Sequence, residues 1–197
     1  MPPRIPQYPV DDLFIGRWSP RALTGESIPD SVLGTLFEAA RWAPSSNNSQ
    51  PWRLLFAKRD SAYFDDFLSL LNPRNQSWAY RASVLIVIVS KTTYAQPGQP
   101  GAAKALNHSF DAGAAWANLA LQAQLLGWSA HAMGGFDREK ARDVLNVPDH
   151  FHVDIAVAVG KRGDKSILPE ELRPREKPNE RLPISEITIE GRFRDPQ

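Results

Sequence analysis

A run of six consecutive apolar residues, from Val84 to Val89, constrains the fold of this chain more than any other stretch. It reads Val-Leu-Ile-Val-Ile-Val. Continuous runs of this length, rich in β-branched residues, are typical of strands that are buried on both faces of a sheet. The run therefore predicts the most buried strand of the protein, with other elements covering it.

Weaker patterns predict the elements around this strand. Further strands are expected at 53–58, 128–133 and 152–159, and helices at 10–16, 29–42, 61–71, 110–126 and 137–145. The stretches 72–80 and 92–103 are expected to be loops, the second because of its Pro and Gly residues. Roughly four core strands interleaved with helices predict an α+β or α/β sandwich, in a single domain that spans 1–197.

The helix expected at 110–126 and the two ends of the chain indicate a second subunit. The helix is Ala-rich and apolar on most faces, so it needs cover on all sides, which in a small domain indicates a dimer interface. Residues 1–9 are Pro-rich and expected to form an extended arm. Residues 161–197, with one strand-like piece at 184–189, are either disordered or an arm that wraps the partner; the isoleucines there favour the arm because they need burial.

Composition excludes several classes of protein. A net charge of +1 argues against a nucleic-acid binder that neutralises phosphates. There is no cysteine, and therefore no disulfide, thiolate nucleophile or cysteine metal site. No segment approaches the roughly 20 apolar residues of a membrane span, and the N-terminus lacks the apolar core of a signal peptide. The cytoplasm is the expected location, with no membrane partner.

The sequence carries no recognisable motif for catalysis by side chains alone. Patterns typical of hydrolase nucleophiles, zinc sites and phosphate-binding loops do not occur, and Gly134-Gly135 is too short for a dinucleotide fingerprint. No metal site is expected, because His150 and His152 fit a solvated strand entry and lack further partners. His131 fits either a hydrogen-bonded core histidine or a site residue. If the chain is an enzyme, a bound cofactor is expected to supply the chemistry.

Two polar segments are the strongest candidates for a binding site. Ala43 to Trp52 places six small or amide side chains between two prolines, which fits either a plain turn or a ligand-binding turn beside an apolar wall. The segment Arg17-Trp18-Ser19-Pro20-Arg21 places two guanidiniums around a hydroxyl in extended backbone. Because guanidinium forks bind phosphate oxygens bidentately, this second segment is a candidate anion site.

Taken together, Arg-x-Ser-x-Arg at 17–21 and Pro-Ser-Ser-Asn-Asn-Ser-Gln-Pro-Trp at 44–52 resemble the flavin-dependent nitroreductase family, and the similarity extends from Val10 to about Pro183. The resemblance implies an α/β/α sandwich of the α+β class, with a central, mostly antiparallel sheet flanked by helices. It also implies an intertwined homodimer that binds FMN at the subunit interface.

The resemblance assigns phosphate-binding and ribityl-binding positions residue by residue. These match Arg17, the backbone of Trp18, Ser19 and Arg21, together with the late arginine Arg181. Three arginines around a phosphate of nearly two negative charges make physical sense, because such hydrogen bonds are charge-assisted.

The remaining carried-over positions surround the flavin ring. A turn that the family's partner subunit contributes matches Pro44, Ser45, Ser46 and Asn48. Asn75 matches an amide at the ring edge. The turn whose N–H groups face flavin N5 and O4 matches Gly134 and Gly135, directly after Met133. Glycine there permits close approach of the backbone to the ring.

The chain departs from the family pattern in places. Gly134 stands where some relatives have an acidic residue. Asn179 stands where a second basic residue is common, and Arg175 or Lys177 is expected to substitute for it. The insertions that shape the substrate pocket in larger relatives are reduced to 92–109. For the wall above the ring we expect four side chains from loop positions: Trp78, Tyr80, His108 and Phe110.

The resemblance implies an NAD(P)H-dependent oxidoreductase. Hydride would pass from the nicotinamide to flavin N5, and then to a small electron-poor acceptor such as a nitroaromatic, a quinone or an enone. Two alternatives stay open. One is a flavin-binding protein that stores, senses or consumes the flavin without NAD(P)H turnover, and the other is a flavin-free anion-binding module.

Overall fold

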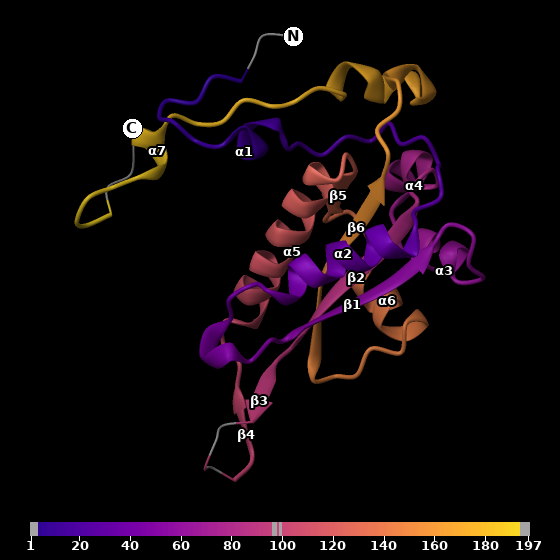
Figure 1. Ribbon diagram of the computed structural model, residues 1–197. Coiled ribbons are helices and arrows are strands. Elements are labelled where there is room, and N and C mark those ends of the chain that lie inside the picture. Colours follow the sequence, from indigo (N-terminus) through magenta and orange to yellow (C-terminus); the bar gives the residue numbers. More distant parts are fainter. Residues whose placement is uncertain (1–3, 96–97, 99, 194–197) are drawn as a thin grey trace.

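A four-stranded antiparallel sheet forms the centre of the computed structural model, which describes residues 4–95, 98 and 100–193 (Figure 1). The strands lie in the order β1-β2-β6-β5. Their bounds are Trp52–Lys58 for β1, Val84–Lys91 for β2, Phe151–Gly160 for β6 and Ser129–Met133 for β5. The strand with the continuous apolar run, β2, is hydrogen-bonded on both edges, to β1 and to β6.

The apolar run of β2 is continuous because helices cover both faces of the sheet. Val84, Ile86 and Ile88 pack on the face covered by α2 (Asp30–Arg41) and α5 (His108–Leu125). The intervening residues 85, 87 and 89 pack on the opposite face, under α3 (Phe64–Ser69), α4 (Pro73–Ala79) and α6 (Arg138–Val144). The predicted sandwich, with a mostly antiparallel sheet between helical layers, is confirmed.

Two stretches predicted as loops contain regular structure. Residues 73–79 form α4 because Asn72 caps the helix by accepting a hydrogen bond from the Asn75 N–H, and Pro73 occupies its first position. The stretch 92–103 contains part of a hairpin of β3 (Thr93–Ala95) and β4 (Ala102–Lys104), whose tip includes positions outside the described residues. The helix expected at 61–71 is shorter than predicted, because 61–63 form a turn before α3.

Helix α5 is only half covered within one chain. Its inner face is buried at Ala112, Ala115 and Leu119, against α2 and the sheet. Its outer face is exposed at Gly113 and Ala117. The chain therefore supplies cover for one side of this apolar helix and leaves the other side open.

The C-terminal region divides into two parts. The first contains the short 3-10 helices η2 (Lys165–Ile167) and η3 (Glu170–Arg175), and it packs on its own subunit, where Leu168 and Leu172 are buried in the core. The expected arm therefore does not begin at 161. From about 177 the chain leaves the body and runs beside the N-terminal segment and α1 (Asp12–Gly16) (Figure 1).

The far end of this segment is the helix α7 (Ile184–Ile187), where a strand-like piece was expected. Its first N–H donates to the Gln7 side chain at 2.7 Å, which ties the two terminal segments together. Among the described residues, no helix combines the length and the apolar character that a bilayer crossing requires.

Candidate functional site

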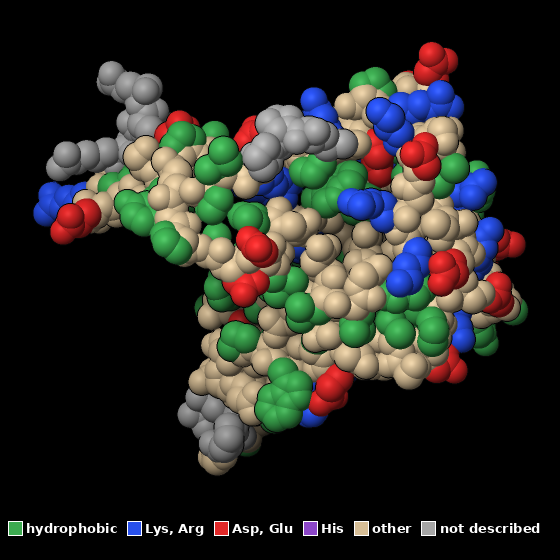
Figure 2. Space-filling model, turned by 45° about the horizontal axis from the view of Figure 1, so that its top comes forward, with side chains coloured by type: hydrophobic (Ala, Val, Ile, Leu, Met, Phe, Trp, Pro, Cys, Tyr) green, Lys and Arg blue, Asp and Glu red, His purple; other side chains and the backbone are tan. Residues whose placement is uncertain are grey.

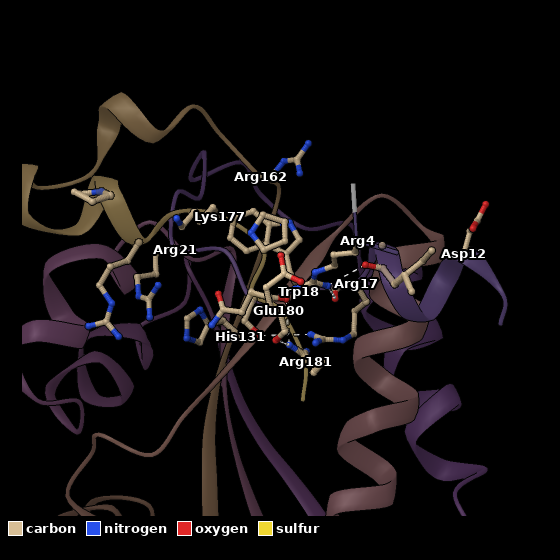
Figure 3. Close-up of a pocket in the computed structure, with 17 residues that line it drawn as sticks. Arg4, Asp12, Arg17, Trp18, Arg21, His131, Arg162, Lys177, Glu180 and Arg181 are labelled. Carbon is tan, nitrogen blue, oxygen red and sulfur yellow. Dashed lines mark hydrogen bonds between the residues drawn. The ribbon is translucent and has the colours of Figure 1, made fainter. Parts of the chain in front are cut away.

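A cleft of about 980 Å³ lies beneath the C-terminal segment, beside α1 and β5 (Figures 2 and 3). Two carboxylates line it, those of Asp12 and Glu180. Seven cationic side chains also line it: Arg4, Arg17, Arg21, Arg162, Arg175, Lys177 and Arg181. Within the residues that the structure describes, none of the seven forms an ion pair with a carboxylate. The cleft therefore carries uncompensated positive charge, which suits an anionic ligand.

The backbone of residues 17–21 is held in place by polar contacts that leave its guanidiniums available. Arg4 donates from Nη1 to the carbonyls of Ile15 and Arg17, at 2.9 Å each. The buried Glu176 carboxylate accepts hydrogen bonds from the N–H of Arg21 at 2.9 Å and of Ala22 at 2.8 Å. Among the described residues, the Arg17 side chain has a single hydrogen bond, which Nη1 donates to the Ser19 hydroxyl at 3.4 Å.

Repulsion among these guanidiniums shows in their pKa values. Burial lowers the pKa of Arg17, and the nearby charges of Arg181 and Arg4 lower it further. Burial also lowers the pKa of Arg21; Glu176 opposes this shift, while Arg175 and Arg74 add to it. A bound anion would relieve both effects, because it replaces lost hydration and screens like charges.

His131 sits between the arginines as a neutral group. Burial, the largest cause, lowers its pKa from 6.5 to about 4, and the Arg21 and Arg17 charges lower it as well. Its Nδ1 lies 3.0 Å from the Pro20 carbonyl, which can only accept, so Nδ1 carries the proton. The ring packs on Trp78, with centroids 4.8 Å apart. His131 thus fixes Pro20 and presents an unprotonated Nε2.

The turn after β5 offers two backbone donors. The Gly135 carbonyl accepts hydrogen bonds from the Asn72 N–H and from Asn75 Nδ2, both at 3.0 Å. In the described chain, neither the Gly134 N–H nor the Gly135 N–H finds an acceptor. Gly134 lies three residues beyond His131, so its N–H is within about 10 Å of the cleft. They border a second hollow of about 470 Å³.

The polar turn at 45–50 lies at the other end of the molecule. It contains the 3-10 helix η1 (Ser46–Asn48), and the Ser46 N–H donates to Asp111 near the start of α5, at 3.1 Å. The cleft approaches α5 near its end, where Gly16 adjoins Gln124. Thirteen helical residues separate these two points, about 20 Å along the axis. Within one chain, the turn therefore lies far from the cleft (Figure 1).

The turn has an unusual backbone. Asn47, Asn48 and Gln50 all have positive φ, at 53°, 50° and 46°. Non-glycine residues rarely adopt this region, and clusters of such residues are typical of functional sites. The geometry therefore favours a binding role for this turn over a plain connection.

The structure brings together part of the predicted site. Five predicted residues line the cleft: Arg17, Trp18, Ser19, Arg21 and Arg181. Arg175 and Lys177, expected to substitute near Asn179, line it too. Asn75 joins the Gly134–Gly135 turn, and Met133 is buried behind it. The remaining predicted positions, Pro44, Ser45, Ser46 and Asn48, stay in the distant turn.

The prediction for the wall above the ring is wrong for Trp78. Its side chain is 1% exposed because α4 turns this position into the core, beneath His131. Tyr80 is exposed but does not line the cleft. His108 and Phe110 lie at the start of α5, near η1, so one chain does not bring them to the cleft either.

Sequence reasoning missed three residues that shape the cleft: Arg4, Arg162 and Glu176. Arg4 lies in a Pro-rich lead, and Glu176 is one of several acidic residues in a charged tail. Nothing in their local pattern distinguishes them, because their partners are 11 to 155 residues away in the sequence.

The two glycines of the turn should differ in their tolerance of a side chain. A Cβ at Gly135 would clash with Asn72 Nδ2 and lie 2.9 Å from Asn75 Nδ2, whereas a Cβ at Gly134 would meet open space. We expect Gly135→Ala to lower the free energy of unfolding by about 1–3 kcal/mol, the range for overpacking. Gly134→Ala is the matched control and should cost less than about 1 kcal/mol. Urea unfolding of both variants measures this, and equal losses would contradict the assigned geometry.

His131 should make the stability depend on pH. Between pH 6.5 and about 4 the unfolded chain protonates this residue and the folded chain does not, so stability falls as the pH is lowered through this window. The full effect is up to about 3 kcal/mol. We expect His131→Gln to flatten the plot of unfolding free energy against pH in this window. An unchanged slope would show that the residue ionises freely in the folded protein.

Comparison with known proteins identifies the family. The model of the nitroreductase family matches residues 15–72 and 56–161. An uncharacterized 15.4 kDa protein of Mycolicibacterium smegmatis is 35% identical over 130 residues, which cover 66% of this chain and 84% of that protein. An NADH dehydrogenase of Thermus thermophilus is 24% identical, over 94% of this chain and 97% of its own. The crystal structure of an oxidoreductase containing FMN has a TM-score of 0.94 and 46% identity, over 98% of this chain and 97% of its own. With a matched region that includes residues 17–21, the Ser-Asn turn and the Gly134–Gly135 turn, the chain belongs to the nitroreductase family.

Proposed function

We propose that this protein is an FMN-dependent oxidoreductase that moves hydride from NAD(P)H to a small electron-poor acceptor such as a nitroaromatic, a quinone or an enone. The observation that carries the proposal is the cleft whose seven cationic side chains form no ion pair with a carboxylate in the part of the chain that the structure describes. The 46% identical structure described as containing FMN supports the cofactor. The relative described as an NADH dehydrogenase supports a pyridine nucleotide as the electron donor.

The residues of the cleft fit the phosphate of a flavin mononucleotide. Arg17 and Arg181 would bind its oxygens through charge-assisted hydrogen bonds, with the Ser19 hydroxyl as a neutral donor. Arg21, on the other side of His131, would face the rest of the cofactor (Figure 3). Because Glu176 and His131 already hold this backbone, little further ordering is needed on binding.

The Gly134–Gly135 turn fits the ring edge of the flavin. Bound FMN would supply the hydride-transfer chemistry, for which the described chain has no motif of its own. The two unpaired N–H groups would donate to acceptor atoms of the ring and stabilise the negative charge that develops there. Asn75, fixed by its bond to the Gly135 carbonyl, retains its side-chain oxygen as an acceptor.

We further propose that two chains form a homodimer in which the turn at 45–50 of one subunit completes the cleft of the other. The distance between turn and cleft within one chain supports this arrangement, as does the open face of α5, where Phe110 is 81% exposed. The terminal segments also expose apolar side chains (Figure 2), namely Ile5, Tyr8, Leu182, Ile187 and Phe193. These would be buried by an arm that wraps the partner from about residue 177 onward.

Flavin content and reduction test the function directly. The purified protein should be yellow, and NADH or NADPH added without oxygen should bleach the flavin. A colourless protein that takes up no added FMN would overturn the proposal. A yellow protein that neither nucleotide bleaches would instead support a flavin store or sensor.

Arg17 should contribute strongly to cofactor affinity. We expect Arg17→Ala to weaken FMN binding by about 2–3 kcal/mol, the cost of losing a charged hydrogen-bond partner. Lys165→Ala, which removes an exposed cation outside the cleft, is the control and should bind FMN like the parent. Titration of the flavin-free proteins with FMN, followed by flavin fluorescence, measures both affinities. An Arg17→Ala variant that binds as tightly as the parent would refute the phosphate assignment.

The open face of α5 should be the centre of the dimer. Ala117→Glu places a charge on that face, and we expect it to shift the protein toward monomers because the charge would be desolvated in the interface. Ala62→Glu makes the same change at an exposed position before α3 and should leave the dimer intact. Sedimentation velocity distinguishes the two states, and a parent protein that sediments as a monomer would contradict the arrangement.

A further inference from the structure

The cleft carries more positive charge than one mononucleotide requires. Seven cations and two carboxylates line it. A phosphate group brings nearly two negative charges. With this phosphate bound, an excess of about three positive charges remains. Like charges that crowd a cleft without partners destabilise it, so the excess indicates a second anionic ligand.

Four of the seven cations lie on either side of His131. Arg4, Arg17 and Arg181 lie together on one side, and Arg21 lies on the other (Figure 3). Within the first group, the charges of Arg181 and Arg4 act on the pKa of Arg17. The pKa of Arg21 is lowered by burial and raised by Glu176, and the charges of Arg175 and Arg74 lower it further. Arg21 and Arg175 both line the cleft and form a second centre of positive charge. Arg74 is not a lining residue, and it adds its charge from outside the cleft.

The second centre is built by contacts that the fold supplies. The Glu176 carboxylate, bound to the N–H groups of Arg21 and Ala22, brings the end of η3 against residues 21–22. Arg175 precedes Glu176 and lines the cleft. Arg74 lies in the first turn of α4, next to Asn75, which is bound to the Gly135 carbonyl. Arg74 and Arg175 are both exposed, so a ligand entering from solvent can reach them.

We propose that Arg74 and Arg175, beside Arg21, form a second anion subsite that binds a phosphate group of the pyridine nucleotide. This inference rests on the proposed function. FMN has a single phosphate, which the group of Arg4, Arg17 and Arg181 would take. The acceptors proposed above are uncharged, whereas NADH carries a pyrophosphate and NADPH an additional 2′-phosphate. Guanidinium pairs suit such oxygens because they bind them bidentately.

The subsite is tested with Arg74→Ala and Arg175→Ala in the FMN-loaded protein. Lys165→Ala removes an exposed cation outside the cleft, and it serves as the matched control. Isothermal titration calorimetry with NADP⁺ and NAD⁺ reports binding without any turnover. Flavin reduction is then compared for NADPH, for NADH and for 1-benzyl-1,4-dihydronicotinamide, which has no phosphate.

We expect each subsite variant to weaken NADP⁺ binding by about tenfold or more, as for other charged hydrogen bonds. The Lys165→Ala variant should bind both nucleotides like the parent, and the benzyl compound should reduce the FMN-loaded subsite variants as it reduces the parent. If the 2′-phosphate is the bound group, NAD⁺ affinity will not change. If the pyrophosphate is bound, NAD⁺ and NADP⁺ will lose affinity equally. Both results support the subsite and identify its ligand group.

Three results would overturn the subsite: unchanged NADP⁺ affinity in both variants, an equal loss in Lys165→Ala, or an equal loss of reduction by the benzyl compound. Failure of the proposed function appears differently, as absence of FMN or as flavin that no donor reduces. Calorimetry with NADP⁺ needs no flavin reduction, so it tests the subsite in that case too.

Discussion

The structure depends on holding several guanidiniums close together without neutralising them. An ion pair with a carboxylate would give each arginine a partner, but it would also neutralise the charge of the guanidinium. This chain restrains the backbone instead: Arg4 donates to two carbonyls, Glu176 accepts from two N–H groups, and His131 holds the Pro20 carbonyl. The one buried carboxylate near Arg21 is occupied by peptide groups. The cost of the arrangement is burial of the guanidiniums together with their mutual repulsion, which lower the pKa of Arg17 and Arg21 and make anion binding favourable.

The same sheet serves both the core and the site. The two faces of β2 are covered by α2, α3, α4, α6 and the inner face of α5. The parts that do not help to cover β2 are one face of α5, the terminal segments and the turn at 45–50. These are the parts that lack cover or lie far from the cleft within one chain. The second subunit proposed above would cover the open face of α5 and would also complete the site.

The sequence predicted the central strand and the sheet because their signals are local. The continuous apolar run at Val84–Val89 fits a buried strand. Asp137 marks the start of α6 because its side chain caps the helix. The loop predicted at 72–80 was wrong because Asn72-Pro73 starts a helix, with Asn72 as its cap and Pro73 in its first turn. The placement of Trp78 followed from that error. The motif at 17–21 was recognisable since its residues are contiguous, whereas Arg4 and Glu176 act across the fold and leave no local pattern.

The turn at 45–50 shows why its composition is hard to interpret. Its amide side chains suit a polar ligand, but Asn47, Asn48 and Gln50 also adopt a left-handed backbone. Among residues with a side chain, asparagine is one of the few that tolerates this conformation well. Ligand binding and the left-handed backbone therefore both favour asparagine in this turn. An exchange of Asn48 for serine would keep a hydrogen-bonding group and still disturb the loop, so loss of binding in such a variant would measure backbone shape as much as ligand contact.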